Sequence, residues 1–271
     1  MDIIQAIILG IIQGLTEFAP VSSSAHLVLV PWALGWAPPT LAFDTILHLG
    51  TLVAVVAVFW RDILTLLGAW LRSFSSGGRA DPQATMAWAI IIGTIPAAVI
   101  GYLLKSVFEE MFSVPLLVGV FLVVTALSLV AGEFVGKRVT ARPAIGLIGG
   151  LLVGIAQVFA IAPGISRSGA TMTAGRALGL SREEAARFSF LLSIPIILGA
   201  GLSQAREMIH SGQLQATEVP IALGFLAAVV SGYLCINFLL SFLRRRSFLA
   251  FSAYCAVVGI AAIALSLARG S

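Results

Sequence analysis

The stretch QGLTEFAPVSSSAH, residues 13–26, interrupts an apolar segment where a membrane helix would otherwise continue. It follows the apolar run IIQAIILGII and places a carboxylate, a proline, three serines and a histidine in close succession. Ionisable groups at membrane depth are costly and usually have a functional role. The stretch therefore predicts a helix that breaks inside the membrane and a site built from its polar groups.

The composition of the whole chain supports a membrane environment. Of 271 residues, 59% are hydrophobic and only 10% are charged, with a mean hydropathy of +1.05. Soluble domains carry about 25% charged residues. The pI of about 9.6 does not indicate nucleic-acid binding, because membrane loops carry excess Lys and Arg for topological reasons. We expect an all-α polytopic membrane protein in a lipid bilayer, with no nucleic-acid partner.

Two apolar regions, 3–35 and 144–180, differ from ordinary membrane spans because each breaks at a proline among polar residues and then resumes. Such a break is typical of a re-entrant hairpin, and irregular backbone at membrane depth is tolerated only inside protein or beside a wet cavity. Six other segments are long and apolar enough to cross the bilayer as helices. These predicted spans are 44–70, 84–104, 114–131, 186–203, 219–243 and 249–268.

The two breaks resemble each other. IIQGLTEFAPVSSSA aligns with GIAQVFAIAPGISRSGA, with one gap, on a glutamine, an Ala-Pro pair and the serines that follow. Each hairpin is followed by three spans, so we predict an internal duplication, 1–131 and 144–271. A hairpin returns to its face of entry and three spans then cross, so the second copy is inverted. Inverted repeats place their sites near the midplane, where broken helices meet.

Basic residues predict the orientation of this fold. Eleven Lys and Arg residues fall on one face, against Lys105, Arg206 and Arg269 on the other. The positive-inside rule makes the first face cytoplasmic. Both termini and the mouth of the first hairpin are then expected on the outer side of the membrane. The residues on the basic face are Arg61, Arg72, Arg79, Lys137, Arg138, Arg142, Arg182, Arg187, Arg244, Arg245 and Arg246.

The first break combines a carboxylate with possible helix caps. Gln13 and Glu17 are four residues apart and share one helix face, and Pro20 ends that helix. Residues 22–24 are serines that can cap the next helix, with His26 on its first turn. Capping alone would explain the serines, but it does not explain a carboxylate and an imidazole at this depth.

The second break is PGISRSGAT, residues 163–171, and its central feature is Arg167 flanked by two serines. A helix is predicted to begin here and to run to about Leu178. Helix N-termini attract anions, phosphate above all, and a guanidinium offers a two-pronged donor for phosphate oxygens. Together the two breaks predict a phosphate site that also holds a hydroxyl nucleophile, an imidazole and a carboxylate, which are the groups that phosphoryl transfer requires.

One further pair of ionisable residues lies at the start of a predicted span. Asp44 and His48 are four residues apart near the predicted outer mouth. They are suited to holding a headgroup or a cation, but we favour simple anchoring at the interface.

These motifs match a known family. With FWRDI, GTIPAAVIG and FSFLLSIP, the two long motifs resemble those of the bacterial undecaprenyl-diphosphate phosphatases of the BacA (UppP) type, in the same order over residues 8–200. The resemblance implies six spans and two re-entrant hairpins in an inverted repeat. It also implies hydrolysis of the terminal phosphate of a C55 lipid diphosphate, which yields the monophosphate carrier for cell-wall synthesis, and a requirement for a divalent cation, Mg²⁺ or Ca²⁺.

The family motifs transfer residue by residue. The glutamate-rich motif falls on Gln13 and Glu17, and the serine and histidine positions fall on Ser23, Ser24 and His26. Gln13 stands where many members have a second glutamate, which weakens the case for a strong metal ligand there. Ser24 and the alanine after it replace the common Thr-Gly. The arginine motif falls on Gly164, Ser166, Arg167, Ser168 and Thr171.

The resemblance suggests a role for each residue. Arg167 binds the phosphates, Ser23 is the nucleophile and His26 is an acid or base. Glu17 either activates a hydroxyl or holds the cation with Gln13. Attack by water without a phosphoserine stays open. The remaining predicted substrate-binding residues are Ser22, Ser24, Gly164, Ser166, Ser168, Gly169 and Thr171.

A transporter is the competing class. Inverted repeats with broken helices are typical of transporters, and a flippase of polyprenyl phosphate would need the same anion site. It would not need a nucleophile beside an imidazole and a carboxylate, so we favour the phosphatase. A homodimer is compatible with the sequence.

Overall fold

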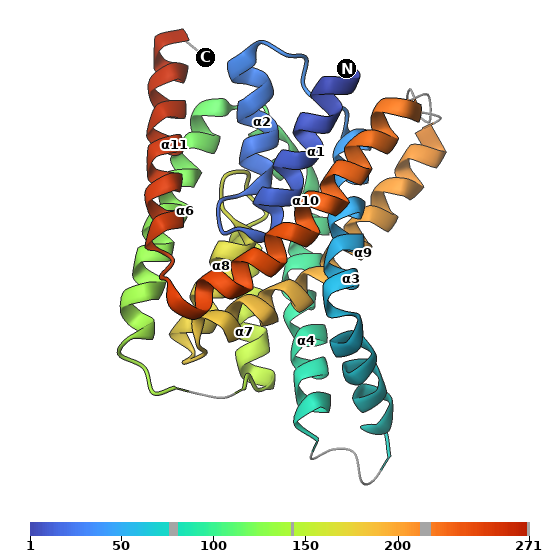
Figure 1. Ribbon diagram of the computed structural model, residues 1–271, viewed down its shortest axis with the longest axis vertical. Coiled ribbons are helices and arrows are strands. Elements are labelled where there is room, and N and C mark those ends of the chain that lie inside the picture. Colours follow the sequence, from blue (N-terminus) through green and yellow to red (C-terminus); the bar gives the residue numbers. More distant parts are fainter. Residues whose placement is uncertain (76–80, 142–143, 212–217, 270–271) are drawn as a thin grey trace.

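The computed structural model describes residues 1–75, 81–141, 144–211 and 218–269, and over these residues the protein is built from helices without strands (Figure 1). The helices are α1 (Ile3–Phe18), α2 (Ser23–Leu34), α3 (Leu41–Arg72), α4 (Pro82–Leu103), α5 (Lys105–Met111), α6 (Pro115–Gly136), α7 (Leu147–Phe159), α8 (Arg167–Ala177), α9 (Arg182–Ser211), α10 (Glu218–Arg245) and α11 (Leu249–Arg269).

Six of the described helices are long and apolar enough to cross a membrane: α3, α4, α6, α9, α10 and α11. They coincide with the six spans that the sequence predicts, with ends that differ by a few residues. The chain is therefore a multi-pass membrane protein, as its composition indicates.

Four shorter helices form two broken pairs in the middle of the molecule. α1 ends at Phe18, two residues before Pro20, and α2 follows it; α7 ends at Phe159, before Pro163, and α8 follows. The loops of the two breaks lie side by side (Figure 1), and Ser168 beyond one break donates a hydrogen bond of 3.0 Å to the Ala19 carbonyl in the other. Both proline breaks therefore occur where the sequence predicts them.

Small residues let the broken helices pack closely on long ones. A Cβ atom added at Gly10 of α1 would lie 2.3 Å from the Gly224 carbonyl oxygen on α10. One added at Gly154 of α7 would lie 2.3 Å from the Gly93 carbonyl oxygen on α4. Small residues at such seams are the usual way for membrane helices to approach closely. Each broken pair is thus fixed against a long helix through backbone contact.

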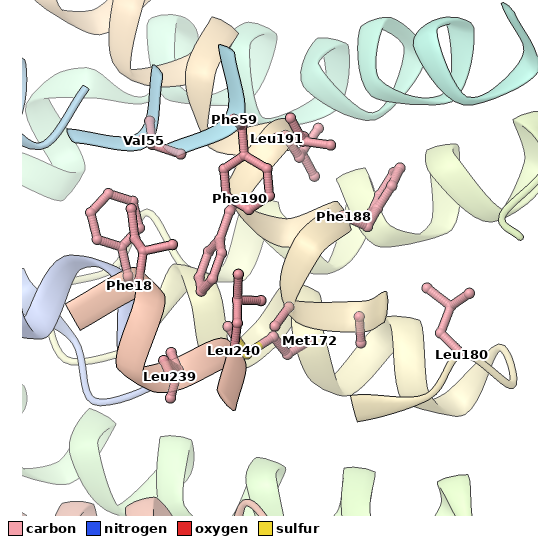
Figure 2. Close-up of a cluster of buried hydrophobic side chains, with 14 of the residues drawn as sticks. Phe18, Val55, Phe59, Met172, Leu180, Phe188, Phe190, Leu191, Leu239 and Leu240 are labelled. Atoms are coloured by element: carbon pink, nitrogen blue, oxygen red, sulfur yellow. The ribbon is translucent and has the colours of Figure 1, made fainter. Parts of the chain in front are cut away.

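An aromatic cluster lies at the end of α1 (Figure 2). Phe18 meets Phe190 of α9 edge to face, with ring centroids 5.4 Å apart, and Phe59 of α3 lies 6.2 Å from Phe190. All three side chains are fully buried. Aromatic pairs at such distances add to the stability gained by burial, and here they fix the end of α1 one residue after Glu17.

Candidate functional site

The first break has a strained turn at the start of α2. Ser22 is the N-cap residue, and its hydroxyl accepts a hydrogen bond from the Ala25 amide at 3.4 Å. Its φ of 68° makes it the only described residue other than glycine with a positive φ. Such a conformation costs free energy and is retained mostly at functional sites. The serine capping that the sequence predicts is confirmed for Ser22.

The second break is held by caps and by a tight glycine turn. Ser166 caps α8 by accepting a hydrogen bond from the Gly169 amide at 3.1 Å. Gly164 has a φ of 105°, and a Cβ atom there would lie 2.5 Å from the Val118 carbonyl oxygen, so only glycine fits. Thr125 of α6 donates to the Gly164 carbonyl at 2.8 Å and accepts from the Ser166 amide at 3.0 Å.

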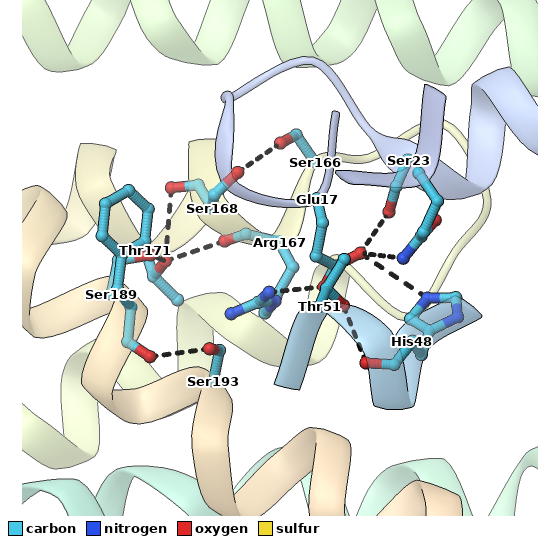
Figure 3. A network of polar contacts seen from close by, with 12 residues as sticks. Glu17, Ser23, His48, Thr51, Ser166, Arg167, Ser168, Thr171, Ser189 and Ser193 are labelled. Atoms are coloured by element: carbon cyan, nitrogen blue, oxygen red, sulfur yellow. Dashed lines mark hydrogen bonds and ion pairs between the residues drawn. The ribbon is translucent and has the colours of Figure 1, made fainter. Parts of the chain in front are cut away.

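The two breaks meet at the carboxylate of Glu17 (Figure 3). Arg167 Nη2 lies 2.6 Å from Glu17 Oε1. The hydroxyl of Ser23 donates to Glu17 Oε2 at 2.6 Å, and Gln13 Nε2 donates to the same oxygen at 2.9 Å. Four residues of the predicted site, from both halves of the chain, therefore form one hydrogen-bonded cluster.

This cluster is buried and has unused hydrogen-bonding groups. The Glu17 side chain is 5% exposed and that of Arg167 is 14% exposed. Arg167 Nη1 and Gln13 Oε1 are buried and have no hydrogen-bond partner within the described protein. Buried polar groups in native proteins nearly always have partners. A charged donor left without one, beside a nucleophile candidate, indicates a site whose ligand is an anion.

The predicted cation can be tested against the same residues. Gln13 Oε1 is a free oxygen ligand next to Glu17. Mg²⁺ and Ca²⁺ take six or more oxygen ligands, and the described residues contain no group of three or more His, Cys, Asp or Glu that could hold a metal ion. The two residues therefore fit only part of a cation's ligand shell, and phosphate oxygens and water would complete it.

His26 was predicted to act as an acid or base beside Ser23, but its ring faces α11 rather than the Glu17 cluster. Its Nδ1 is 2.8 Å from the Ser22 carbonyl oxygen, and its Nε2 is 2.8 Å from the Tyr254 hydroxyl on α11. A carbonyl only accepts, so Nδ1 carries the hydrogen and Nε2 accepts from the tyrosine. The two rings also stack, with centroids 5.6 Å apart. Both ring nitrogens are thus engaged outside the Glu17 cluster.

His48 on α3 takes the position beside the carboxylate. Its Nε2 lies 3.6 Å from Glu17 Oε2 (Figure 3). Its Nδ1 is 2.8 Å from the Asp44 carbonyl oxygen. The position of Asp44 and His48 in the sequence favours interfacial anchoring, whereas in the structure the imidazole faces the site. The signal that would have found it is an ionisable pair at the start of an apolar span, where the bilayer makes charge costly.

Several other predicted residues support the breaks. The hydroxyls of Ser166 and Ser168 are 3.1 Å apart. Thr171 donates to the Arg167 carbonyl at 2.8 Å and shares a hydrogen bond of 2.7 Å with Ser189 of α9, a partner that the sequence did not indicate. These contacts brace the first turn of α8, which carries Arg167.

The hydroxyl of Ser24 lies 3.1 Å from that of Ser22 at the start of α2. Both serines therefore lie at the N-terminus of this helix, as the sequence predicts.

Comparison with known proteins gives a consistent result. A family model described as bacitracin resistance protein BacA matches residues 6–261. A Pelotomaculum thermopropionicum protein named undecaprenyl-diphosphatase is 48% identical over 269 residues, covering 99% of this chain and 98% of its own length. A protein of the same name from Moorella thermoacetica is 45% identical, covering 94% of this chain and 94% of its own length. Another from Methanosphaera stadtmanae is 44% identical, covering 98% of this chain and 99% of its own length.

Proposed function

Because the chain belongs to the bacitracin resistance protein BacA family, we propose that it hydrolyses undecaprenyl diphosphate to undecaprenyl phosphate and inorganic phosphate. The observation that carries the proposal is the buried Nη1 of Arg167, which has no hydrogen-bond partner among the described residues. This donor belongs to the same cluster as the Ser23 hydroxyl, which is already hydrogen-bonded to a carboxylate. An anion site with an activated hydroxyl is suited to phosphoryl transfer.

For the architecture, we propose an inverted repeat, 1–131 and 144–271, with re-entrant hairpins at α1–α2 and α7–α8. The contacts between helices support it, because α1 packs on α10 as α7 packs on α4, and α3 packs on α10 as α9 packs on α4. α6 and α11, which are equivalent helices of the two halves, contact each other through equivalent glycines. A Cβ atom added at Gly119 of α6 would lie 3.0 Å from the Gly259 carbonyl oxygen, and a Cβ atom added at Gly259 of α11 would lie 2.8 Å from the Gly119 carbonyl oxygen. A pseudo-twofold axis produces this pattern.

In our proposal the diphosphate lies between the two breaks and the lipid tail leaves sideways between helices. Arg167 binds the phosphates and stabilises the charge that develops on the transferred group. The N-termini of α2 and α8, with the serines that cap them, add backbone donors. The ion pair with Glu17 holds the guanidinium in place before the substrate arrives.

We propose Ser23 as the nucleophile and Glu17 as its base. The Ser23 oxygen forms a bond to the terminal phosphorus while its proton passes to Glu17 Oε2, 2.6 Å away. The bond to the lipid phosphate breaks, and undecaprenyl phosphate leaves with the electron pair. After Glu17 has released that proton, it deprotonates a water molecule that attacks the phosphorus. The bond from phosphorus to the Ser23 oxygen then breaks, inorganic phosphate leaves, and Glu17 returns the proton of the water to the serine oxygen. His26 would have to release Tyr254 before acting as acid or base.

A divalent cation bound with the diphosphate would neutralise part of its charge and so ease nucleophilic attack. Gln13, through its free Oε1, and Glu17 are the residues that would hold it. No step in this scheme requires a second copy of the chain.

The proposed site opens to the outer side of a bacterial inner membrane, with both termini on that side. The excess of Lys and Arg on the opposite face supports this orientation. Single cysteines in the loop between α2 and α3 should react with an impermeant maleimide added outside intact cells. Labelling only after the membrane is permeabilised would contradict the orientation.

The activity is tested with purified protein, a polyprenyl diphosphate and a divalent cation. We expect inorganic phosphate to be released with the wild-type protein and not with the Arg167→Ala variant. Rapid quenching with labelled diphosphate should trap phosphate on Ser23. Turnover without trapping would favour direct attack by water, and movement of lipid between leaflets without phosphate release would favour the transporter.

A further inference from the structure

We propose that Thr125 of α6 is a positioning residue of the site, whose hydroxyl fixes the backbone of the second break so that Arg167 meets the diphosphate in one arrangement. This inference rests on the proposed function. Thr125 lies in the middle of an apolar span, outside every motif that the sequence offers for the site. It does not have to touch the substrate, because it acts on the rate through the helix start that carries Arg167.

The Thr125 hydroxyl holds the second break at two points. It donates to the Gly164 carbonyl at 2.8 Å and accepts from the Ser166 amide at 3.0 Å. Thr125 is 1% exposed, so water does not compete for either hydrogen bond. One hydroxyl therefore joins a carbonyl and an amide on the two sides of residue 165 and fixes the turn between them.

The same face of α6 leaves this turn no room to shift. Gly164 has a φ of 105°, and a Cβ atom added there would lie 2.5 Å from the Val118 carbonyl oxygen and 2.7 Å from the Phe121 Cβ. Residues 118, 121 and 125 are three and four apart, so they share one face of the helix. The break thus lies directly on α6, and Thr125 determines where along that helix it is held.

This contact determines where α8 begins. Ser166 is the N-cap residue: its amide is bound by Thr125, and its hydroxyl accepts from the Gly169 amide at 3.1 Å. The amides of Arg167 and Ser168 have no hydrogen-bond partner among the described residues, since the first amides of a helix have none within it. These two amides and the Arg167 side chain are the donors that a phosphate would meet at this end of α8.

The position of these donors matters for the rate. Donors that stabilise a developing charge are effective when they are already in place before the reaction. A displacement of about 1 Å at such a site can lower the rate about 100-fold. Arg167 reaches across to Glu17 at 2.6 Å, so a shift in the start of α8 would also change how the two breaks meet.

The first test is a series of substitutions at Thr125 in the full-length protein. Phosphate release from a polyprenyl diphosphate is measured with a divalent cation present. Thr125→Val keeps the shape of the side chain and removes both hydrogen bonds, so kcat should fall about 10-fold to 100-fold. Thr125→Ser keeps the hydroxyl and should retain most of the rate. Thr125→Cys, whose thiol is a weak donor and acceptor, should fall between them, and this order tests the inference even if Thr125→Val does not fold.

The second test asks whether Thr125 acts through Arg167. Thr125→Val is combined with Arg167→Lys, which keeps the charge but lacks the planar two-pronged donor. Substitutions that act through one another are not additive, so in the Arg167→Lys background Thr125→Val should lower kcat by only about 3-fold or less. A loss of stability alone would lower kcat by the same factor in both backgrounds, and that result would overturn the positioning role.

The matched control is Ser128→Ala on the same helix, because the Ser128 hydroxyl donates to the Thr125 carbonyl of its own turn, at 2.8 Å. Its rate should equal that of the wild type. Full kcat in Thr125→Val, or equal losses in Thr125→Ser and Thr125→Cys, would also overturn the inference. If Arg167→Ala is inactive in those cases, the proposed function stands. Full turnover in Arg167→Ala would overturn the function itself.

Discussion

The two breaks share a layout and differ in chemistry. In each, a helix with a buried glutamine ends before a proline, and a serine caps the helix that follows. The first break then places a carboxylate and a hydroxyl at the centre, and the second places a guanidinium there. Gln13 is hydrogen-bonded to Glu17, whereas neither polar side-chain atom of Gln157 has a partner in the described protein. In our proposed function, a matched scaffold thus divides one site into a reactive half and a binding half.

The largest effect should come from removing the charge of the second break. Arg167→Ala should lower kcat by about 10³-fold or more, because one arginine that stabilises a transferred phosphoryl group contributes that much. Phosphate release measures it. Arg187→Ala is the control, because the ion pair of Arg187 with Asp62, at 2.7 Å, is half-exposed. The rate of this variant should stay near that of the wild type. Equal losses would mean that the two arginines act only on stability.

A smaller loss should follow from removing the hydroxyl of the first break. Ser23→Ala should lower kcat by about 10²-fold to 10³-fold and abolish phosphate trapping, since electrostatic stabilisation by the second break persists. Ser24→Ala, whose hydroxyl contacts Ser22 at 3.1 Å rather than Glu17, should keep most of the activity. Near-full turnover by Ser23→Ala would exclude it as the nucleophile.

Gln13 and Gln157 occupy equivalent positions in the two breaks, so substituting each of them tests directly whether the two breaks differ in function. Gln13→Leu should slow turnover about 10-fold and raise the cation concentration required, because Gln13 orients Glu17 and offers a metal ligand. Gln157→Leu should leave turnover unchanged and raise the melting temperature, because it removes an unpaired buried amide that costs about 1–3 kcal/mol. Turnover and the melting temperature should be measured in parallel for both variants. A catalytic defect in Gln157→Leu would show that both halves still work on the substrate.

The smallest effect should be that of Tyr254→Phe. The change removes the hydrogen bond to His26 Nε2 but keeps the ring stacked on the imidazole. Stability should fall by about 1 kcal/mol, the net value of a typical hydrogen bond, and kcat should change only a few-fold. A loss comparable to that of Ser23→Ala would place Tyr254 in the chemistry of the first break.

Much of this arrangement could be predicted from sequence because it depends on local signals. The six spans can be predicted from hydropathy, and the two breaks from their prolines. The caps at Ser22 and Ser166 can be predicted because each serine comes two or three residues after the proline of its break, where the next helix begins. The cost of an ionisable group at depth predicts that Glu17 and Arg167 belong to one site, but their direct ion pair was not the favoured prediction and is found in the structure. These signals are each contained within a short stretch.

The partners from distant helices could not be predicted in the same way. Thr125, Ser189 and Tyr254 lie in apolar spans, where single polar residues are ordinary, and only the fold brings them to the breaks. His26 was expected to face the nucleophile, but its position in the first turn does not specify which neighbour its ring meets. His48 was assigned to the interface because nothing local links α3 to α1.

The seams between short and long helices have a consequence for how the molecule is assembled. α1 lies on α10 and α7 lies on α4, so each half of the chain carries its broken helix against a span of the other half. The two halves of the chain are therefore interlocked, because each packs its own broken helix on a long helix of the other half. Neither half contains the whole site or the surface that holds its own broken helix. Two polypeptides divided near residue 142 and synthesised together should therefore restore activity, and either one alone should not.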